Sequence, residues 1–207
     1  SPSTVSVPGF TYVPAFLTSE EVEHLSASVQ AGPQEGLAPK RKRPEAATSG
    51  VHWHGFAGWP PVTVPTESTH DGLRSLIDCC YEPLQRLRSE GYIPPGYFFD
   101  QAIVNCYDNC SSGLPMHVDR AAFDDVIVGF SVGAAAIMDL APVKPGVATA
   151  SGPWVQVLEE GSAYVLADEV RWKWQHGVRL KDPEAAGQRV SITFRRLKRN
   201  AGLAVEG

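Results

Sequence analysis

RVSITFR, at residues 189–195, alternates apolar and polar side chains along its whole length. A period of two indicates a β-strand, because successive side chains of a strand point to opposite faces of its sheet. One face is apolar and the other is polar with an arginine at each end: Val190, Ile192 and Phe194 against Arg189, Ser191, Thr193 and Arg195. The strand is either an edge strand with a solvated face, or its polar face looks into a barrel. In the second case the two arginines, about 20 Å apart at roughly 3.3 Å per residue, would converge on an anionic ligand.

The stretches upstream of this strand are also short and apolar, and Gly, Pro, Asp and Ser separate them. This pattern is typical of antiparallel strands joined by tight turns. The predicted strands cover residues 98–107, 126–140, 155–158, 162–167, 171–176 and 188–197. A run of strands this short predicts a jelly roll or barrel, whose interior can hold a ligand.

Two helices are predicted ahead of this β half. Thr18 and Glu21 have the spacing of a capping box, and apolar residues follow at helical spacing, so residues 19–30 should form an amphipathic helix. Apolar residues between 71 and 90 also step by three and four, and Pro83 should kink or split that helix. A short strand is expected at residues 10–16, before the first helix.

The chain has 207 residues, of which 43% are hydrophobic and 20% charged, as expected for one globular domain. We therefore predict a single domain of class α+β, mainly β: N-terminal helices and a loop region at 1–97, a β core at 98–197 and a tail at 198–207. The longest apolar run, residues 126–138, contains two glycines and is too short to span a bilayer. The first residues carry no signal-peptide pattern, which favours a trimmed segment of an intracellular protein of the cytoplasm or nucleus.

His117 and Asp119 are two residues apart, so on a strand they would share one face. A second histidine would complete a two-histidine, one-carboxylate facial triad, which leaves three adjacent positions on Fe(II) open. His176 is the best-placed partner, because it ends a predicted strand just before a glycine. His52 and His54 would also share a face, but a hairpin with aromatic packing explains their stretch better.

Two further polar groups, Asn105 and Tyr107, share a face of another predicted strand. Together with the two arginines of 189–195 they would suit a small dicarboxylate.

The net charge of −5 provides no general attraction for nucleic acid, so such a partner would need a local basic patch. Lys40, Arg41, Lys42 and Arg43 form such a patch in a Gly- and Pro-rich loop, where solvation explains them equally well.

Six short motifs in their order and spacing resemble the motif series of the AlkB-type Fe(II)/2-oxoglutarate dioxygenases. They are NCY at 105–107, HVD at 117–119, SVG at 131–133, GS at 161–162, HG at 176–177 and RVSITFR at 189–195. The likeness covers residues 98–197, with a weaker match in the N-terminal helices. The fold that it implies is a double-stranded β-helix, a form of the jelly roll.

The resemblance also implies the roles of the site residues. Fe(II) would be held by His117, Asp119 and His176. The cosubstrate 2-oxoglutarate would be held by Arg189 and Arg195 through its carboxylates, with hydrogen bonds from Asn105 and Tyr107 and with Ser191 beside it. With O2, such enzymes convert 2-oxoglutarate to succinate and hydroxylate an alkyl carbon, chiefly on nucleic acids; a methyl group on nitrogen would then be lost as formaldehyde.

Two departures bear on the substrate. Ser191 stands where the bacterial demethylase has Asn, which should leave 2-oxoglutarate binding intact. Ala121 stands where the DNA-repair members carry an acidic residue near the methylated base, which argues against their mode of base recognition. Residues 122–125 and 131–139 are more similar to the eukaryotic branch whose oxygenase domain hydroxylates a modified wobble uridine of tRNA.

Three functions are therefore compared: an oxygenase acting on RNA or DNA, a related oxygenase acting on a protein or small molecule, and a non-catalytic β-barrel. The intact metal and arginine motifs argue against the last. The basic residues 40–43 and 195–199, together with Trp53 and Trp59, favour nucleic acid, while the acidic pI near 5.7 counts the other way. The segment from Lys40 to Trp59 is expected to form a substrate lid, in which Trp53 or His54 stacks on an extruded base.

Overall fold

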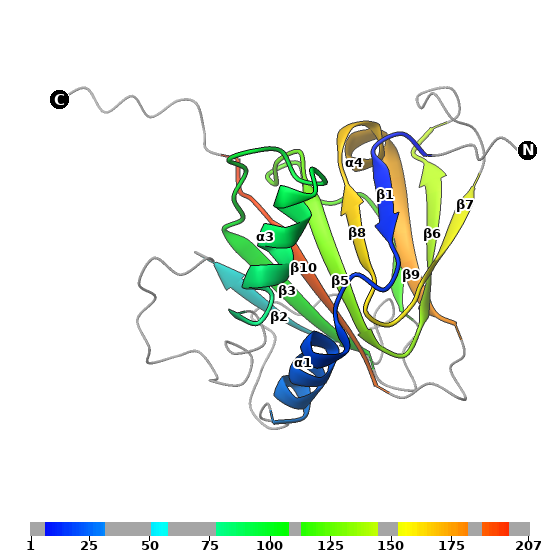
Figure 1. Cartoon of the computed structure of the whole chain (residues 1–207). Coiled ribbons are helices and arrows are strands. Elements are labelled where there is room, and N and C mark those ends of the chain that lie inside the picture. Colours follow the sequence, from blue (N-terminus) through cyan, green and yellow to red (C-terminus); the bar gives the residue numbers. More distant parts are fainter. Residues whose placement is uncertain are drawn as a thin grey trace, which may run out of the picture.

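The computed structural model describes residues 7–31, 51–57, 78–107, 113–144, 153–181 and 188–198, with the backbone alone for 29–31 and 51–57. Two β-sheets face one another, and two helices lie against the outer face of the larger sheet (Figure 1). The helices are α1 (Ser19–Ala31), α3 (Tyr81–Ser89) and the short α4 (Asp168–Lys173).

All strand pairings in the two sheets are antiparallel. The larger sheet has the order β1-β8-β5-β10-β3-β2, formed by β1 (Phe10–Val13), β8 (Ala163–Leu166), β5 (Ile127–Gly133), β10 (Arg189–Arg195), β3 (Gln101–Tyr107) and β2 (Val51–Ala57). The smaller sheet has the order β4-β9-β6-β7, formed by β4 (Leu114–His117), β9 (Trp174–Leu180), β6 (Ala136–Pro142) and β7 (Trp154–Leu158). The predicted fold class, a mainly β jelly roll with N-terminal helices, is confirmed.

Strand β10 lies inside the larger sheet, between β3 and β5. Its apolar residues Val190, Ile192 and Phe194 pack in the core under α1 and α3. Its polar face is buried as well, with Arg189 only 1% exposed. The interpretation of 189–195 as an edge strand with a solvated face is therefore wrong, and the polar face lies between the two sheets.

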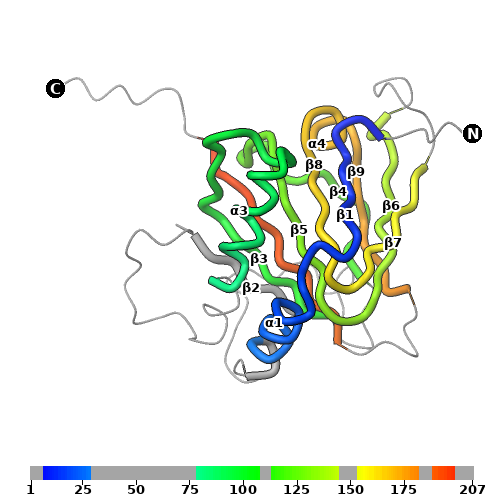
Figure 2. The backbone as a smooth tube through the Cα atoms, viewed as in Figure 1, coloured from blue at the N-terminus to red at the C-terminus, as the bar shows by residue number. Residues whose placement is uncertain are grey.

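The predicted strand 126–140 is two strands, β5 and β6, which belong to different sheets. The chain turns at Gly133, whose φ of 77° lies in the left-handed region that favours glycine. A Cβ there would lie 2.1 Å from the carbonyl oxygen of Gln188. Continuous apolar character concealed this turn, which carries the chain from one sheet to the other (Figure 2).

The predicted strand 171–176 is also wrong in its first half, because α4 occupies residues 168–173 and β9 begins at Trp174. Acidic residues in the first turn of α4, Asp168 and Glu169, and basic residues in its last turn suit the helix dipole. The chain passes directly from α4 into β9 (Figure 2).

The N-terminal part of the chain supplies strands as well as helices. β1 pairs with β8 and β2 pairs with β3, so both extend the larger sheet. Pro83 lies in the first turn of α3, where a missing N–H removes no hydrogen bond, and residues 71–77 of the predicted helix lie outside the described part. The division at residue 97 stays a prediction. Among the described helices, none is long and apolar enough to cross a lipid bilayer.

An ion pair fastens α1 to α3. Glu21 accepts hydrogen bonds from Nη1 and Nη2 of Arg86 at 3.0 and 2.8 Å, and Arg86 also donates to the carbonyl of Phe16. The predicted capping box is present, because Thr18 and Glu21 exchange backbone-to-side-chain hydrogen bonds. The hydrogen bond from Arg86 outweighs partial burial and lowers the pKa of Glu21 below its ordinary 4.5.

Glu21→Gln should lower the free energy of unfolding by about 1–2 kcal/mol at neutral pH, because it weakens both the cap and the ion pair. A carboxylate with a depressed folded-state pKa stabilises above the unfolded-state value and loses that effect as pH falls through the folded-state pKa. The difference between wild type and variant, measured by urea unfolding, should therefore shrink in acid. Glu20→Gln, on the adjacent residue, is the control; equal effects of the two substitutions would contradict the ion pair's role.

Candidate metal centre and anion pocket

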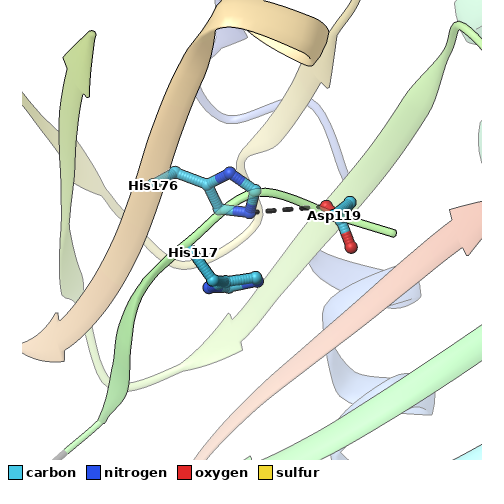
Figure 3. A group of neighbouring side chains, drawn as sticks. All are labelled: His117, Asp119 and His176. Carbon is cyan, nitrogen blue, oxygen red and sulfur yellow. Dashed lines mark ion pairs between the residues drawn. The ribbon is translucent and has the colours of Figure 1, made fainter. Parts of the chain in front are cut away.

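Three potential metal ligands, which come from β4, β9 and the loop after β4, lie close together. His117 ends β4, His176 is the third residue of β9, and the two are paired in register, with ring centroids 4.5 Å apart. Asp119 joins them, so that one ligand atom of each residue lies within 4.8 Å of the others (Figure 3). β4 stops at His117, so strand alternation does not bring Asp119 to this place; the loop after β4 does.

The protonation states of these residues suit a divalent cation. Nδ1 of His117 lies 2.8 Å from the carbonyl oxygen of Pro115, which can only accept, so Nδ1 carries the proton and Nε2 has a free lone pair. Burial lowers the pKa of His176 to about 4, against the opposing effect of Asp119, and keeps this imidazole neutral. Burial raises the pKa of Asp119, but His176 and Arg195 outweigh it, so the pKa lies below its ordinary value and the carboxyl is ionised.

Arg195 lies beside this cluster. Its Nη1 donates to Oδ1 of Asp119 at 2.9 Å, while Oδ2 of Asp119 lies 3.5 Å from Nε2 of His176. Its guanidinium stacks on the ring of Phe123 at 3.9 Å. In this structure Arg195 therefore orients a candidate metal ligand, Asp119. Its contact with 2-oxoglutarate stays a prediction.

Arg189, at the other end of β10, is buried without a carboxylate partner among the described residues. Its Nη1 and Nη2 donate to the carbonyl of Ala134 and to Oγ of Ser131, each at 3.3 Å. Its Nε makes no hydrogen bond within that same part of the chain. Burial lowers the pKa of Arg189, a direction that reflects the cost of a charge removed from water. A buried cation without an anion is unfavourable, so this place suits the carboxylate of a ligand.

The other residues predicted to bind 2-oxoglutarate gather around Arg189. Tyr107 on β3 is paired in register with Arg189, and the guanidinium lies 5.5 Å from its ring centroid. Asn105 is paired with Ser191 and donates a hydrogen bond to its Oγ at 3.3 Å. The pocket therefore combines one buried charge with hydrogen-bonding groups on two adjacent strands.

The predicted substrate residues are only partly described. Trp53 and His54 lie on β2, opposite Asn105 and Val104 of β3, and their side chains lie outside the described part of the structure. Residues 40–43, the basic loop, also lie outside it.

Arg171 on α4 was missed by the sequence analysis, because its stretch was taken for a strand. Its side chain is 2% exposed, and its guanidinium donates to four backbone carbonyls of the loop after β4. The acceptors and distances are Asp124 at 3.1 Å, Asp119 at 3.2 Å, Arg120 at 3.0 Å and Phe123 at 2.9 Å. Arg171 thereby joins the loop that carries Asp119 to the helix that leads into His176.

Comparison with known families agrees with this geometry. The family model described as the 2OG-Fe(II) oxygenase superfamily matches residues 9–195. The chain belongs to this superfamily. The AlkB type predicted from the motifs agrees with the names of the relatives given below, and the cofactors of the superfamily are Fe(II), 2-oxoglutarate and O2. The chain is therefore a 2-oxoglutarate- and Fe(II)-dependent dioxygenase.

Three relatives define the likeness in sequence. The oxygenase is 30% identical over 176 residues to the mouse protein named tRNA (carboxymethyluridine(34)-5-O)-methyltransferase ALKBH8, covering 83% of this chain and 24% of that protein. It is 32% identical to the namesake from Xenopus tropicalis, over 50% of this chain and 15% of that protein. It is 25% identical to an Arabidopsis thaliana protein named alkylated DNA repair protein ALKBH8 homolog, over 95% of this chain and 60% of that protein. The chain thus spans a quarter or less of the two animal proteins.

Solved structures support the fold. The structure of OsALKBH1 matches with a TM-score of 0.59 at 19% identity, covering 93% of this chain and all of that one. A prolyl hydroxylase from Trichoplax adhaerens, in complex with a hypoxia inducible factor peptide, matches with a TM-score of 0.56 at 15% identity. The match covers 91% of this chain and 83% of that one.

Arg171→Lys should weaken metal binding by about tenfold, since one ammonium cannot serve four carbonyls and the loop that carries Asp119 would loosen. The dissociation constant of Mn(II), used in place of Fe(II), can be measured by calorimetry. Arg179→Lys, at the exposed ion pair with Asp139, is the control and should bind Mn(II) as the wild type does. Wild-type Mn(II) affinity in Arg171→Lys would show that Arg171 does not orient the site.

Proposed function

We propose that His117, Asp119 and His176 hold the Fe(II) of this dioxygenase. The observation that carries the proposal is the convergence of two imidazoles and one carboxylate, with one ligand atom each within 4.8 Å of the others. This donor set is the facial triad of non-haem Fe(II) oxygenases. When bound, the iron supplies the oxidative decarboxylation of 2-oxoglutarate that hydroxylates a substrate C–H bond.

The protein's part is to fix these ligands before the metal arrives. Pro115 sets the tautomer of His117 through its carbonyl, and Arg195 holds Oδ1 of Asp119. Partners of this kind orient metal ligands and raise metal affinity.

We also propose that Arg189 binds a carboxylate of 2-oxoglutarate, with Tyr107, Asn105 and Ser191 beside it. Support comes from burial: a guanidinium that is 1% exposed and has no described anionic partner gains most from a carboxylate. Two charges that meet in a place shielded from water attract strongly, and a guanidinium matches the planar geometry of a carboxylate.

The proposed substrate is an alkylated base in nucleic acid, RNA such as tRNA or DNA, which would place the enzyme in the cytoplasm or the nucleus. Two of the relatives carry names that refer to tRNA methylation and to alkylated DNA. An extruded base presents its alkyl group and its flat face together.

Mass spectrometry of nucleosides tests this function. Incubation of total RNA and of DNA with the enzyme, Fe(II) and 2-oxoglutarate should convert an alkylated nucleoside to a hydroxylated or dealkylated one, with matching succinate. His117→Ala, Asp119→Ala and His176→Ala should each abolish the conversion while remaining folded, because each removes one of three protein ligands. Near wild-type conversion in any of the three would contradict the triad; succinate without any changed nucleoside would favour a protein or small-molecule substrate.

Neutralising Lys40, Arg41, Lys42 and Arg43 together should weaken oligonucleotide binding. It should also reduce the slope of log affinity against log salt concentration by an amount that corresponds to up to about four phosphate contacts. 2-oxoglutarate turnover without nucleic acid should stay nearly unchanged, because the substituted residues lie outside the metal motif. Neutralising the exposed Arg179 and Lys181 is the control. Wild-type affinity and salt slope in the quadruple variant would contradict a lid formed by this loop.

A further inference from the structure

Tyr164 of β8 crosses a neighbouring strand to reach the polar face of β10. In register, Tyr164 is paired with Gly129 of β5, and Gly129 is paired with Thr193 of β10. A Cβ at Gly129 would lie 2.1 Å from Cζ of Tyr164 and 2.4 Å from its hydroxyl oxygen. The phenol therefore lies directly over Gly129, where any other residue would displace it.

The hydroxyl of Tyr164 ends among the polar groups of β10. It shares a side-chain hydrogen bond with Thr193, which lies on the same face as Arg189 and Arg195. It also lies close enough to Arg189, Tyr107 and Asp119 to interact with each electrostatically. Thr193 lies between Arg189 and Arg195 along β10, and Arg195 binds Asp119, so the hydroxyl reaches the stretch of β10 between the buried arginine and the candidate metal centre.

The chemistry of this hydroxyl suits an anion. Burial raises the pKa of Tyr164 to about 12, so the phenol is protonated at neutral pH. In the hydrogen bond with Thr193 one hydroxyl donates and the other accepts, and the proposal takes the threonine hydroxyl as the donor. The phenol proton then remains available for a second partner.

We propose that Tyr164 is a further cosubstrate-binding residue, whose hydroxyl donates a hydrogen bond to a carboxylate of 2-oxoglutarate bound between Arg189 and Asp119. The proposal rests on the function proposed above for Arg189. Filling the core does not require a hydroxyl, since phenylalanine would cover the same glycine. A phenol in this place adds a neutral hydrogen-bond donor beside the charged donors Arg189 and Arg195.

Tyr164→Phe tests the hydroxyl alone. Binding of 2-oxoglutarate, measured by calorimetry on the Mn(II)-loaded protein without turnover, should weaken by about ten- to a hundredfold, the usual effect of losing a hydrogen bond to a charged group. The affinity for Mn(II) itself should not change. Tyr12→Phe is the matched control, because Tyr12 is paired with Tyr164 in register and its hydroxyl accepts a hydrogen bond from the backbone N–H of Glu159.

The possible outcomes separate the two proposals. If the wild-type protein binds no 2-oxoglutarate in the presence of Mn(II), the proposed function fails, and this inference fails with it. If the wild type binds and Tyr164→Phe binds equally well, Tyr164 is a core residue and only this inference is overturned. A purely structural phenol would change the melting temperature of the ligand-free protein and leave the dissociation constant of 2-oxoglutarate unchanged.

Discussion

The buried charge of Arg189 is the constraint on which the rest of the site depends. Its strand lies inside the larger sheet, so its guanidinium cannot reach water, and the described residues offer it two neutral acceptors and no carboxylate. A protein keeps such a charge buried at a cost to stability. The cost is understandable where a cosubstrate supplies the missing anion, and it explains why the polar face of β10 turns toward the smaller sheet.

The two sheets carry different parts of the candidate site. The larger sheet carries Arg189 and the hydrogen-bonding groups around it, and the smaller sheet carries both histidines through the pairing of β4 with β9. Asp119 connects the two, because it faces His176 and accepts a hydrogen bond from Arg195 of the larger sheet. Arg171 then fixes the loop of Asp119 from behind, so that metal and cosubstrate are received by parts of the fold that are already joined.

Local pattern was enough to predict β10, its two faces, and the histidines, because a period of two and a His-x-Asp spacing are visible in a few residues. It could not predict features set by distant partners. The turn at Gly133 depends on the approach of Gln188, and α4 extends into residues 171–173, which were predicted as part of a strand. Tyr164 looked like an ordinary strand residue, since its direction depends on the glycine opposite it on β5. Arg171 shows its role only when the loop after β4 is folded around it.

The central claim is that Arg189 and the triad receive one ligand, 2-oxoglutarate, that contacts both the pocket and the metal. Calorimetric titration of 2-oxoglutarate into the protein, with and without Mn(II) in place of Fe(II), tests it most directly. The account predicts that the metal tightens 2-oxoglutarate binding and, by linkage, that 2-oxoglutarate tightens metal binding by the same factor. Independent binding of the two, or no binding of 2-oxoglutarate at all, would contradict it.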